Sequence, residues 1–351
     1  MKVAIIGCGT IANAAHIPAY MKNPEAEIKY FCDIIPERAE KAVETYGCGT
    51  AITDYHVALN DPEIEAVSVC TPNNMHPVIA IDALRAGKNV LCEKPAARTY
   101  AEALEMQKVQ HETGKVLNIG VVNRFNDSVN LIKQFIDEGK LGEVFHVYVS
   151  FRAHRSIPGL GGAFTTKAIA GGGALIDWGV HYLDIVMYCC GDPTPKTVTG
   201  EAFCKLGKDM KNYAYKNMWA ENTKNLNGTY DVDDSVTAFV RTEGPTITLN
   251  GAWAQNIGVS ETYIDFLGTK AGIRLQYGGD FTVYGTKDGK LISYKPEYES
   301  TPMFQNEINA FVRCVQTGEK LPSHIDRNIL TSKLMQGIYD SSDANREVVM
   351  E

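Results

Sequence analysis

The first 122 residues alternate short apolar runs with amphipathic stretches, and this alternation limits the possible folds more than any other feature of the chain. Between the apolar runs lie helical patterns such as PERAEKAVETYG (36–47), which begins with proline and ends with glycine. Strand, helix, strand repetition at this spacing predicts right-handed βαβ units and a parallel sheet over residues 1–122. The expected strands are residues 2–7, 27–33, 50–52, 65–71, 88–93 and 115–121.

After residue 122 the pattern becomes that of consecutive strands joined by short turns. A helix-like segment (126–138) precedes a long alternating strand, EVFHVYVSFRAH (143–154). Further strands are expected at 196–203, 234–243, 246–255, 261–269, 272–277 and 280–286, and closing helices at 306–318 and 326–345. This order predicts a second, α+β domain over residues 123–351 with a predominantly antiparallel sheet. A chain of 351 residues exceeds the usual size of a single core, in agreement with two domains.

One segment fits neither strands nor helices. Residues 205–231 are polar, rich in Lys and Asn, and interrupted by glycine, which predicts a long loop. The loop is either disordered or, because it carries Trp219 and several tyrosines, a lid or contact surface.

Charge and composition exclude several classes of protein. The net charge is −8 and no Lys/Arg run of the kind that follows a phosphate backbone occurs, so nucleic acid is not expected as a partner. No stretch approaches the roughly 18 apolar residues of a membrane helix, and the first residues do not resemble a signal peptide, so we expect no membrane association and a cytoplasmic location. The nine cysteines are odd in number and lack a CxxC pair, which predicts reduced core residues.

The motif GCGTIA (7–12) follows the first predicted strand and opens a helix. Gly7 permits a tight turn, Gly9 lets the backbone approach a pyrophosphate, and the small Ala12 allows the helix to pack closely on the strand. The helix N-terminus then faces the phosphates. At the start of a βαβ unit this motif predicts a dinucleotide site rather than only a tight turn. The expected cofactor contacts of this loop are Gly7, Gly9, Thr10, Ile11 and Ala12.

Asp33 ends the second predicted strand, where a carboxylate reaches the adenosine ribose of a dinucleotide. A carboxylate accepts hydrogen bonds from both ribose hydroxyls and repels a 2′-phosphate, and the adjacent Ile34 and Ile35 supply no cation for that phosphate. NAD is therefore the expected cofactor. Arg38 keeps NADP open as an alternative, because a nearby Arg can accommodate the extra phosphate.

Two further motifs, TPNNMH (71–76) and EKP (93–95), follow later strands of the predicted sheet. Ligands of open α/β sheets bind in the crevice outside the carboxyl ends of the strands, so both motifs are expected at the cofactor site. The alternative for TPNNMH is a helix start with Asn73 or Asn74 as its cap, and both interpretations can hold together. The expected cofactor contacts are Thr71, Pro72, Asn73, His76, Glu93 and Lys94.

The chain resembles the Gfo/Idh/MocA oxidoreductases, the family named for glucose-fructose oxidoreductase and inositol dehydrogenase. The matching segments span nearly the whole chain: GCGTIA (7–12), CDIIPERAEKA (32–42), TPNNMH (71–76), CEKPAA (92–97) and GGGALIDWGVHYLD (171–184). The resemblance implies an N-terminal Rossmann dinucleotide-binding domain and a C-terminal α+β domain with an open mixed sheet, often used for oligomer contacts. It also implies NAD(P)-dependent oxidation or reduction of a sugar, cyclitol or related polyol, at a site where Lys94 meets Asp177 and His181. In such enzymes the peptide bond before the proline that follows the lysine, here Pro95, is frequently cis.

In the segment 171–184, Asp177, His181 and Asp184 fall at positions i, i+4 and i+7 and share one face of a predicted helix. Oxidation of an alcohol by hydride transfer needs a group that takes the hydroxyl proton, and imidazole titrates nearest to neutral pH, so His181 is the candidate base. Lys94 either stabilises the alkoxide or is itself the base. Asp177 binds a neighbouring hydroxyl or orients the base, and Asp184 is expected to bond structure behind the site.

Two alternatives compete with this catalytic interpretation. His181 could be a core histidine satisfied by Asp177, or the three polar residues could ligate a metal. No further His or Cys cluster lies nearby in the sequence, so no metal is expected.

Several other residues admit two interpretations each. His16 contacts the cofactor or packs its helix, and Arg124 lines the substrate pocket or pairs with an acid across the domain interface. His154 and Arg155 contact substrate or are solvated loop residues. Trp178 is expected to pack rather than to stack on sugar. The second domain shows no evident Arg/Lys cluster for a phosphate, which favours unphosphorylated substrates.

Together these features predict an NAD-dependent dehydrogenase acting on a secondary hydroxyl of a sugar, glycoside or cyclitol. One alternative is a glycoside hydrolase that keeps NAD bound and oxidises its substrate transiently, and another is a non-catalytic sugar or nucleotide sensor. The presence of Lys94, Asp177 and His181 argues against the sensor. A sheet face rich in alternating apolar residues after residue 230 must be covered, which favours a homodimer or homotetramer.

Overall fold

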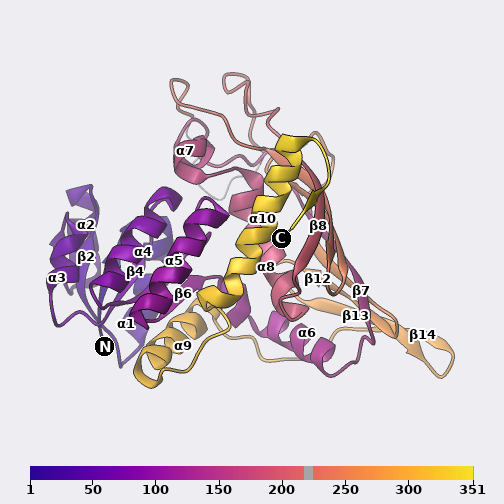
Figure 1. The fold of residues 1–351 in the computed structure, drawn as a ribbon, viewed down its shortest axis with the longest axis horizontal. Coiled ribbons are helices and arrows are strands. Elements are labelled where there is room, and N and C mark those ends of the chain that lie inside the picture. Colours follow the sequence, from indigo (N-terminus) through magenta and orange to yellow (C-terminus); the bar gives the residue numbers. More distant parts are fainter. Residues whose placement is uncertain (217–223, 351) are drawn as a thin grey trace. The chain divides into compact units, whose positions relative to one another are not determined.

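The computed structural model describes residues 1–216 and 224–350, so Trp219 and the middle of the predicted 205–231 loop lie outside the described residues. The chain forms two compact units (Figure 1). The first contains Met1–Asn126 and Thr301–Ile329, and the second contains Asp127–Ser300 and the chain from Leu330 onward.

The first unit is built on a parallel sheet with the strand order β3-β2-β1-β4-β5-β6. Its strands are β1 (Lys2–Ile6), β2 (Glu27–Cys32), β3 (Thr50–Ile52), β4 (Ala66–Val69), β5 (Asn89–Glu93) and β6 (Leu117–Gly120). This sheet confirms the predicted Rossmann domain. The strand order reverses between β1 and β4, which places a topological switch point, the usual ligand crevice of such sheets, beside the glycine motif.

The helices of the first unit connect these strands. They are η1 (Ala12–His16), α1 (Ile17–Lys22), α2 (Pro36–Tyr46), α3 (Tyr55–Asn60), η2 (Asn73–Met75), α4 (His76–Arg85), α5 (Tyr100–Thr113), η3 (Val122–Phe125), α9 (Met303–Thr317) and the start of α10 (Ile325–Ala344). As predicted, α2 begins at Pro36 and ends at Gly47, whose φ of 66° only glycine adopts without cost. The predicted caps are wrong: Pro72 and Met75, not Asn73 or Asn74, occupy the N-cap positions of η2 and α4.

Helix α9 belongs to the first unit, although the sequence boundary at residue 122 assigned it to the second domain. Its buried residues Ile308, Phe311 and Val312 join the apolar cluster of the first sheet, which includes Val3 and Ile5. Burial of these large side chains supplies the free energy that holds α9 there, and a local sequence pattern does not reveal which sheet a helix covers.

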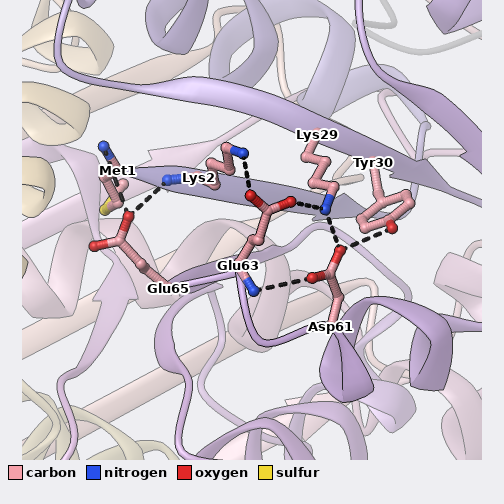
Figure 2. A network of polar contacts seen from close by, with 7 residues as sticks. All are labelled: Met1, Lys2, Lys29, Tyr30, Asp61, Glu63 and Glu65. Atoms are coloured by element: carbon pink, nitrogen blue, oxygen red, sulfur yellow. Dashed lines mark hydrogen bonds and ion pairs between the residues drawn. The ribbon is translucent and has the colours of Figure 1, made fainter.

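Charged residues gather near the amino ends of β1 and β2, at the edge of the sheet opposite the glycine motif (Figure 2). Lys2 binds Glu63 at 2.7 Å, and Lys29 binds both Asp61 and Glu63. The Tyr30 hydroxyl donates to Asp61 at 2.8 Å. These side chains are half-buried, apart from the exposed Glu63, and they lie away from the glycine motif, so the network contributes to local structure rather than to the cofactor crevice.

The second unit contains a nine-stranded sheet with the order β14-β13-β12-β11-β7-β10-β9-β8-β15. Its strands are β7 (Val144–Arg152), β8 (Pro195–Phe203), β9 (Ser235–Thr242), β10 (Thr246–Ala252), β11 (Glu261–Gly268), β12 (Ala271–Gln276), β13 (Phe281–Lys287), β14 (Lys290–Tyr294) and β15 (Val348–Val349). β7 and β10 run parallel and the other neighbours run antiparallel, which confirms the predicted open, mixed, mostly antiparallel sheet. Strands β14 and β15 were not predicted from the sequence.

Helices cover one face of this sheet (Figure 1). They are α6 (Asp127–Asp137), α8 (Val180–Cys189) and the later part of α10, and short helical turns η4 (Ala163–Thr165), α7 (Lys167–Ala170) and η5 (Leu175–Gly179) precede α8. The apolar core joins helix residues such as Leu183 and Leu334 to sheet residues such as Val149 and Leu249. Among the helices of the described residues, none is long and apolar enough to cross a membrane.

Gly251 in β10 tests how tightly β10 packs against Phe151 of the neighbouring strand β7. A Cβ at this position would lie 1.9 Å from Cζ of the fully buried Phe151. We expect Gly251→Ala to lower the free energy of unfolding by about 1–3 kcal/mol, because the core must shift to admit the methyl group. Gly279→Ala is the matched control, since its Cβ would meet no atom closer than 3.6 Å. Equal urea midpoints for the two variants would contradict this packing.

Candidate active site

The glycine loop is shaped by the backbone of the neighbouring strand. Gly7 has a φ of +94°, and a Cβ there would lie 2.5 Å from the carbonyl oxygen of Cys70, so only glycine fits. At Gly9, apart from its neighbours in the chain, no atom of the described residues lies within 4 Å of the position that a Cβ would take. The loop therefore leaves open space beside Gly9, where a phosphate group can approach the backbone at the start of the helix.

Asp33 holds this loop through its carboxylate. Its Oδ2 accepts a hydrogen bond from the Cys8 backbone N–H, and its Oδ1 accepts one from Ile35 N–H, each at 2.9 Å. Asp33 is 7% exposed, while Ile34 beside it is 88% exposed and Arg38 on α2 is exposed. Burial and the nearby Asp33 raise the pKa of the Cys8 thiol to about 12, so this thiol stays protonated at neutral pH.

The TPNNMH and EKP motifs are tied together by His76. Its Nδ1 lies 2.7 Å from the Pro95 carbonyl oxygen, and its Nε2 lies 2.8 Å from the Thr71 carbonyl oxygen. Burial lowers the pKa of His76, although the two carbonyls oppose this in part. The Thr71 hydroxyl oxygen is buried with no hydrogen-bond partner among the described residues. A bound polar ligand would satisfy it.

Glu93 lies at the end of β5 and is held by the helix of the glycine motif. Its Oε1 lies 2.8 Å from Nε2 of His16, and its Oε2 accepts the backbone N–H of Lys94 at 3.0 Å. Nδ1 of His16 contacts the Ser68 hydroxyl at 2.9 Å. The peptide bond from Lys94 to Pro95 is cis, in agreement with the resemblance. His16 is 1% exposed and therefore packs within the first unit instead of projecting toward solvent.

His16 and Glu93 form a buried ion pair. Burial alone would lower the pKa of His16, but the Cys70 sulfur and the Glu93 carboxylate beside the ring reverse this and raise the pKa to about 10. Burial alone would raise the pKa of Glu93, but His16 and Lys94 lower it below its ordinary value. Both groups are therefore charged at neutral pH, and each compensates the burial of the other.

The candidate catalytic residues of the second unit lie where η5 passes into α8. Asp177 belongs to the wider turns of η5, and its Oδ2 accepts a hydrogen bond from the indole Nε1–H of Trp253 at 3.2 Å. His181 is partly exposed in the first turn of α8, and its ring centroid lies 6.4 Å from that of Tyr277. Asp184 is buried and contacts the Thr331 hydroxyl at 3.1 Å, which confirms its expected structural role. Trp178 packs against apolar clusters, as expected.

Asp233, which the sequence analysis missed, anchors the glycines that precede this helix. Its Oδ1 accepts the Gly173 backbone N–H at 2.7 Å, and its Oδ2 accepts the Leu175 N–H at 2.9 Å. The Tyr339 hydroxyl also donates to it at 2.8 Å. A Cβ on Gly173 would lie 1.9 Å from the Asp233 carbonyl oxygen, so the GGG run is needed for this approach. The available signal was the pair of adjacent aspartates, Asp233 and Asp234, where a predicted strand (234–243) begins.

The remaining predicted substrate contacts lie in different environments. Arg124 is 1% exposed and donates from Nη1 to the Pro322 carbonyl oxygen at 2.8 Å, within the first unit. His154 and Arg155 lie just after β7, and both line a surface hollow of the second unit. In the described chain no group of three or more His, Cys, Asp or Glu side chains could hold a metal ion.

The structure brings the predicted residues together within each unit. Gly7, Asp33, Glu93 and Lys94 belong to the first unit, and Asp177 and His181 belong to the second. The predicted meeting of Lys94 with Asp177 and His181 therefore remains a prediction.

Comparison with known proteins extends this description. A family described as "Oxidoreductase family, NAD-binding Rossmann fold" matches residues 1–121, and one described as "GFO/IDH/MocA C-terminal domain" matches residues 129–274. D-glucoside 3-dehydrogenase of Escherichia coli (strain K12) is 30% identical over 351 residues, covering 99% of this chain and 97% of that protein. Levoglucosan dehydrogenase of Pseudarthrobacter phenanthrenivorans is 32% identical over 207 residues, covering 55% of this chain and 52% of that protein.

Solved structures share the fold. A levoglucosan dehydrogenase in complex with NADH and levoglucosan matches with a TM-score of 0.82 and 21% identity, covering 100% of this chain and 99% of that one. An aldose-aldose oxidoreductase from Caulobacter crescentus in complex with glycerol matches with a TM-score of 0.82 and 22% identity, each chain being covered to 99%.

Removal of His16 tests the buried ion pair. His16→Ala leaves the Glu93 carboxylate buried without its partner, so we expect a loss of about 3 kcal/mol in the free energy of unfolding at about pH 6. Because the pKa of His16 is raised from 6.5 to about 10, the stabilisation by His16 is complete below pH 6.5 and is lost as pH rises through about 10. Because the pKa of Glu93 is lowered from 4.5, its stabilisation is lost only in acid.

The difference between wild type and His16→Ala is therefore largest near about pH 6 and shrinks toward about pH 10. Urea titrations at these two pH values measure it. His56→Ala is the control, because His56 pairs with Asp54 at 2.7 Å on the exposed surface and should change little. If His16→Ala lowers the free energy of unfolding by the same amount at both pH values, the charges assigned to His16 and Glu93 are wrong.

Replacement of Asp33 tests cofactor choice. Asp33→Asn removes the charge that repels a 2′-phosphate and weakens the acceptor for ribose hydroxyls, so we expect the Kd for NADH to rise about tenfold and the Kd for NADPH to fall. Fluorescence titration with both cofactors measures the ratio. Asp54→Asn, at an exposed position after β3, is the matched control. Parallel changes for both cofactors would show that Asp33 acts only by holding the loop.

Proposed function

Because the chain belongs to the Gfo/Idh/MocA oxidoreductase family, with an NAD-binding Rossmann domain, we propose that it oxidises a secondary hydroxyl of a sugar, glycoside or cyclitol. The observation that supports this most directly is the Asp177–His181 pair, in which the carboxylate is oriented by Trp253 and the imidazole follows in the first turn of α8. The relative that is 30% identical over nearly the full chain is named D-glucoside 3-dehydrogenase, which supports a glycoside substrate.

NAD fits the first unit. The open space at Gly9, the carboxylate of Asp33 and the unpartnered Thr71 hydroxyl are features that a bound dinucleotide would use. When bound, NAD supplies the hydride acceptor for alcohol oxidation. Loop residues from Gly7 to Ala12 hold the phosphates, and Asp33 holds the adenosine ribose.

Proton transfer is the task of the chain's own residues. We assign His181 as the general base that takes the substrate hydroxyl proton, and Asp177 as the group that binds an adjacent hydroxyl or orients the base. Lys94 donates a hydrogen bond to the reacting oxygen and stabilises its developing negative charge. The Lys94 backbone N–H donates a hydrogen bond to the Glu93 carboxylate, which is itself paired with His16. These two contacts fix where the lysine side chain leaves the strand.

The second unit also supports proposals about assembly and location. The sheet face away from the helices carries exposed apolar side chains, among them Phe239, Leu267 and Tyr284, which supports a homodimer or homotetramer formed through this face. The unit thus serves in substrate binding and oligomerisation. All nine cysteines are free, which supports a reducing, cytoplasmic environment.

The test is NADH absorbance of the protein with NAD and a panel of monosaccharides, cyclitols and glycosides. Sustained NADH formation with one substrate class is expected, and His181→Ala should lower kcat by about 10²–10⁴-fold. His56→Ala, which alters an exposed histidine outside these motifs, is the control. If NADH formation stops at one equivalent per protein, the protein is a hydrolase that retains its cofactor. If none of the substrates changes the NADH absorbance, only the sensor remains.

A further inference from the structure

Three loops of the second unit surround a surface hollow of about 670 Å³. One loop follows β7, one belongs to the segment after β8, and one follows β10. The polar side chains that line the hollow are His154, Arg155, Asn212, Tyr215, Lys216 and Asn256. The described parts of the predicted 205–231 loop therefore contribute one wall.

The hollow is cationic. Arg155 and Lys216 are basic side chains, and no Asp or Glu is among the lining residues, although the chain as a whole has a net charge of −8. In the part of the chain that the structure describes, neither cation forms an ion pair with a carboxylate. Two cations gathered with no counter-charge among the described residues favour a negatively charged ligand.

Arg155 is fixed in place by neutral partners. Its Nη2 donates to Oδ1 of Asn256 at 2.5 Å, and its guanidinium lies 5.4 Å from the centre of the Tyr213 ring. Tyr213 is 3% exposed, and its hydroxyl accepts the Ile157 backbone N–H at 3.2 Å. The Lys216 backbone N–H donates to the Arg155 carbonyl oxygen at 3.0 Å, which brings the second cation to the first. A guanidinium held in this way loses little entropy when an anion binds.

One apolar cluster connects the loops around the hollow to the candidate catalytic residue Asp177. Tyr213 and Trp253 belong to the same cluster of buried residues, which also contacts Trp178. Trp253 donates to Asp177, and its backbone carbonyl oxygen accepts the Ser156 N–H at 2.8 Å. The residue that orients Asp177 thus also packs beneath the loop that carries Arg155.

We propose that this hollow binds a carboxylate or phosphate group carried by the substrate outside the ring that is oxidised. The proposal rests on the proposed function, because it assigns the hollow to the same substrate. Sequence analysis found no Arg/Lys cluster for a phosphate, since Arg155 and Lys216 are far apart in the chain. The fold brings them together, so substrates with an anionic substituent are favoured over their neutral analogues.

The first test compares kcat/KM for methyl β-D-glucoside, methyl β-D-glucuronide and glucose 6-phosphate in the full-length protein with NAD. At least one anionic substrate should exceed the neutral glycoside by about tenfold, and high salt should reduce this advantage. Comparison of the glucuronide with glucose 6-phosphate shows whether the hollow binds a carboxylate or a phosphate. Arg155→Gln and Lys216→Gln should each lower the ratio of anionic to neutral activity by about tenfold. Lys208→Gln removes an exposed lysine from the same segment outside the hollow and should leave the ratio unchanged.

Calorimetric titration with methyl β-D-glucuronide and inorganic phosphate tests the hollow independently of turnover. Saturable binding of either probe that is weakened about tenfold by Arg155→Gln, but not by Lys208→Gln, supports the proposal even if no sugar reduces NAD, in which case only the proposed function fails. If neutral glycosides are oxidised while neither anion binds, or if Arg155→Gln affects neutral and anionic substrates equally, the anion site is overturned and the dehydrogenase stands.

Discussion

The first unit depends on a charge pair buried beneath its ligand crevice. Glu93 ends β5 and would be strongly destabilising without a partner, because an isolated carboxylate loses its hydration on burial. His16, from the helix that the glycine loop begins, supplies the opposite charge at 2.8 Å. The pair therefore joins the phosphate-binding end of the sheet to the strand that presents Lys94. The pair thus acts together with Asp33, which holds the glycine loop, and with His76, which contacts the Pro95 carbonyl oxygen of the EKP motif.

Buried carboxylates perform a related task in the second unit. Asp233 accepts backbone N–H groups of the segment that leads into η5, and Asp234 accepts the N–H groups of Lys205, Leu206 and Gly207 at the start of the long loop. The two adjacent aspartates thus position the helix that carries Asp177 and the loop that forms a wall of the cationic hollow. Neither residue needs to contact substrate for its loss to disturb the site.

The regular elements could be predicted because their signals are local. Short apolar runs identified the strands of the first sheet, β-type runs identified most strands of the second, and the motifs identified the ligand crevice. The exposed strand β14 lacked a buried face and was missed, and α9 was placed with the wrong sheet because its amphipathic pattern does not specify a partner. The pairing of His16 with Glu93, the anchoring role of Asp233 and the convergence of Arg155 with Lys216 join residues far apart in the chain. Such contacts are set by tertiary packing and leave no periodic signal.

The central claim is that residues of this chain take the hydroxyl proton of a sugar substrate, for which bound NAD would supply the hydride acceptor. The most direct measurement is the mass of the reduced cofactor formed from a glycoside that is deuterated on its ring carbons. One deuterium per NADH is expected, because the hydride comes from the oxidised carbon rather than from water. Reduced cofactor without deuterium would contradict the account.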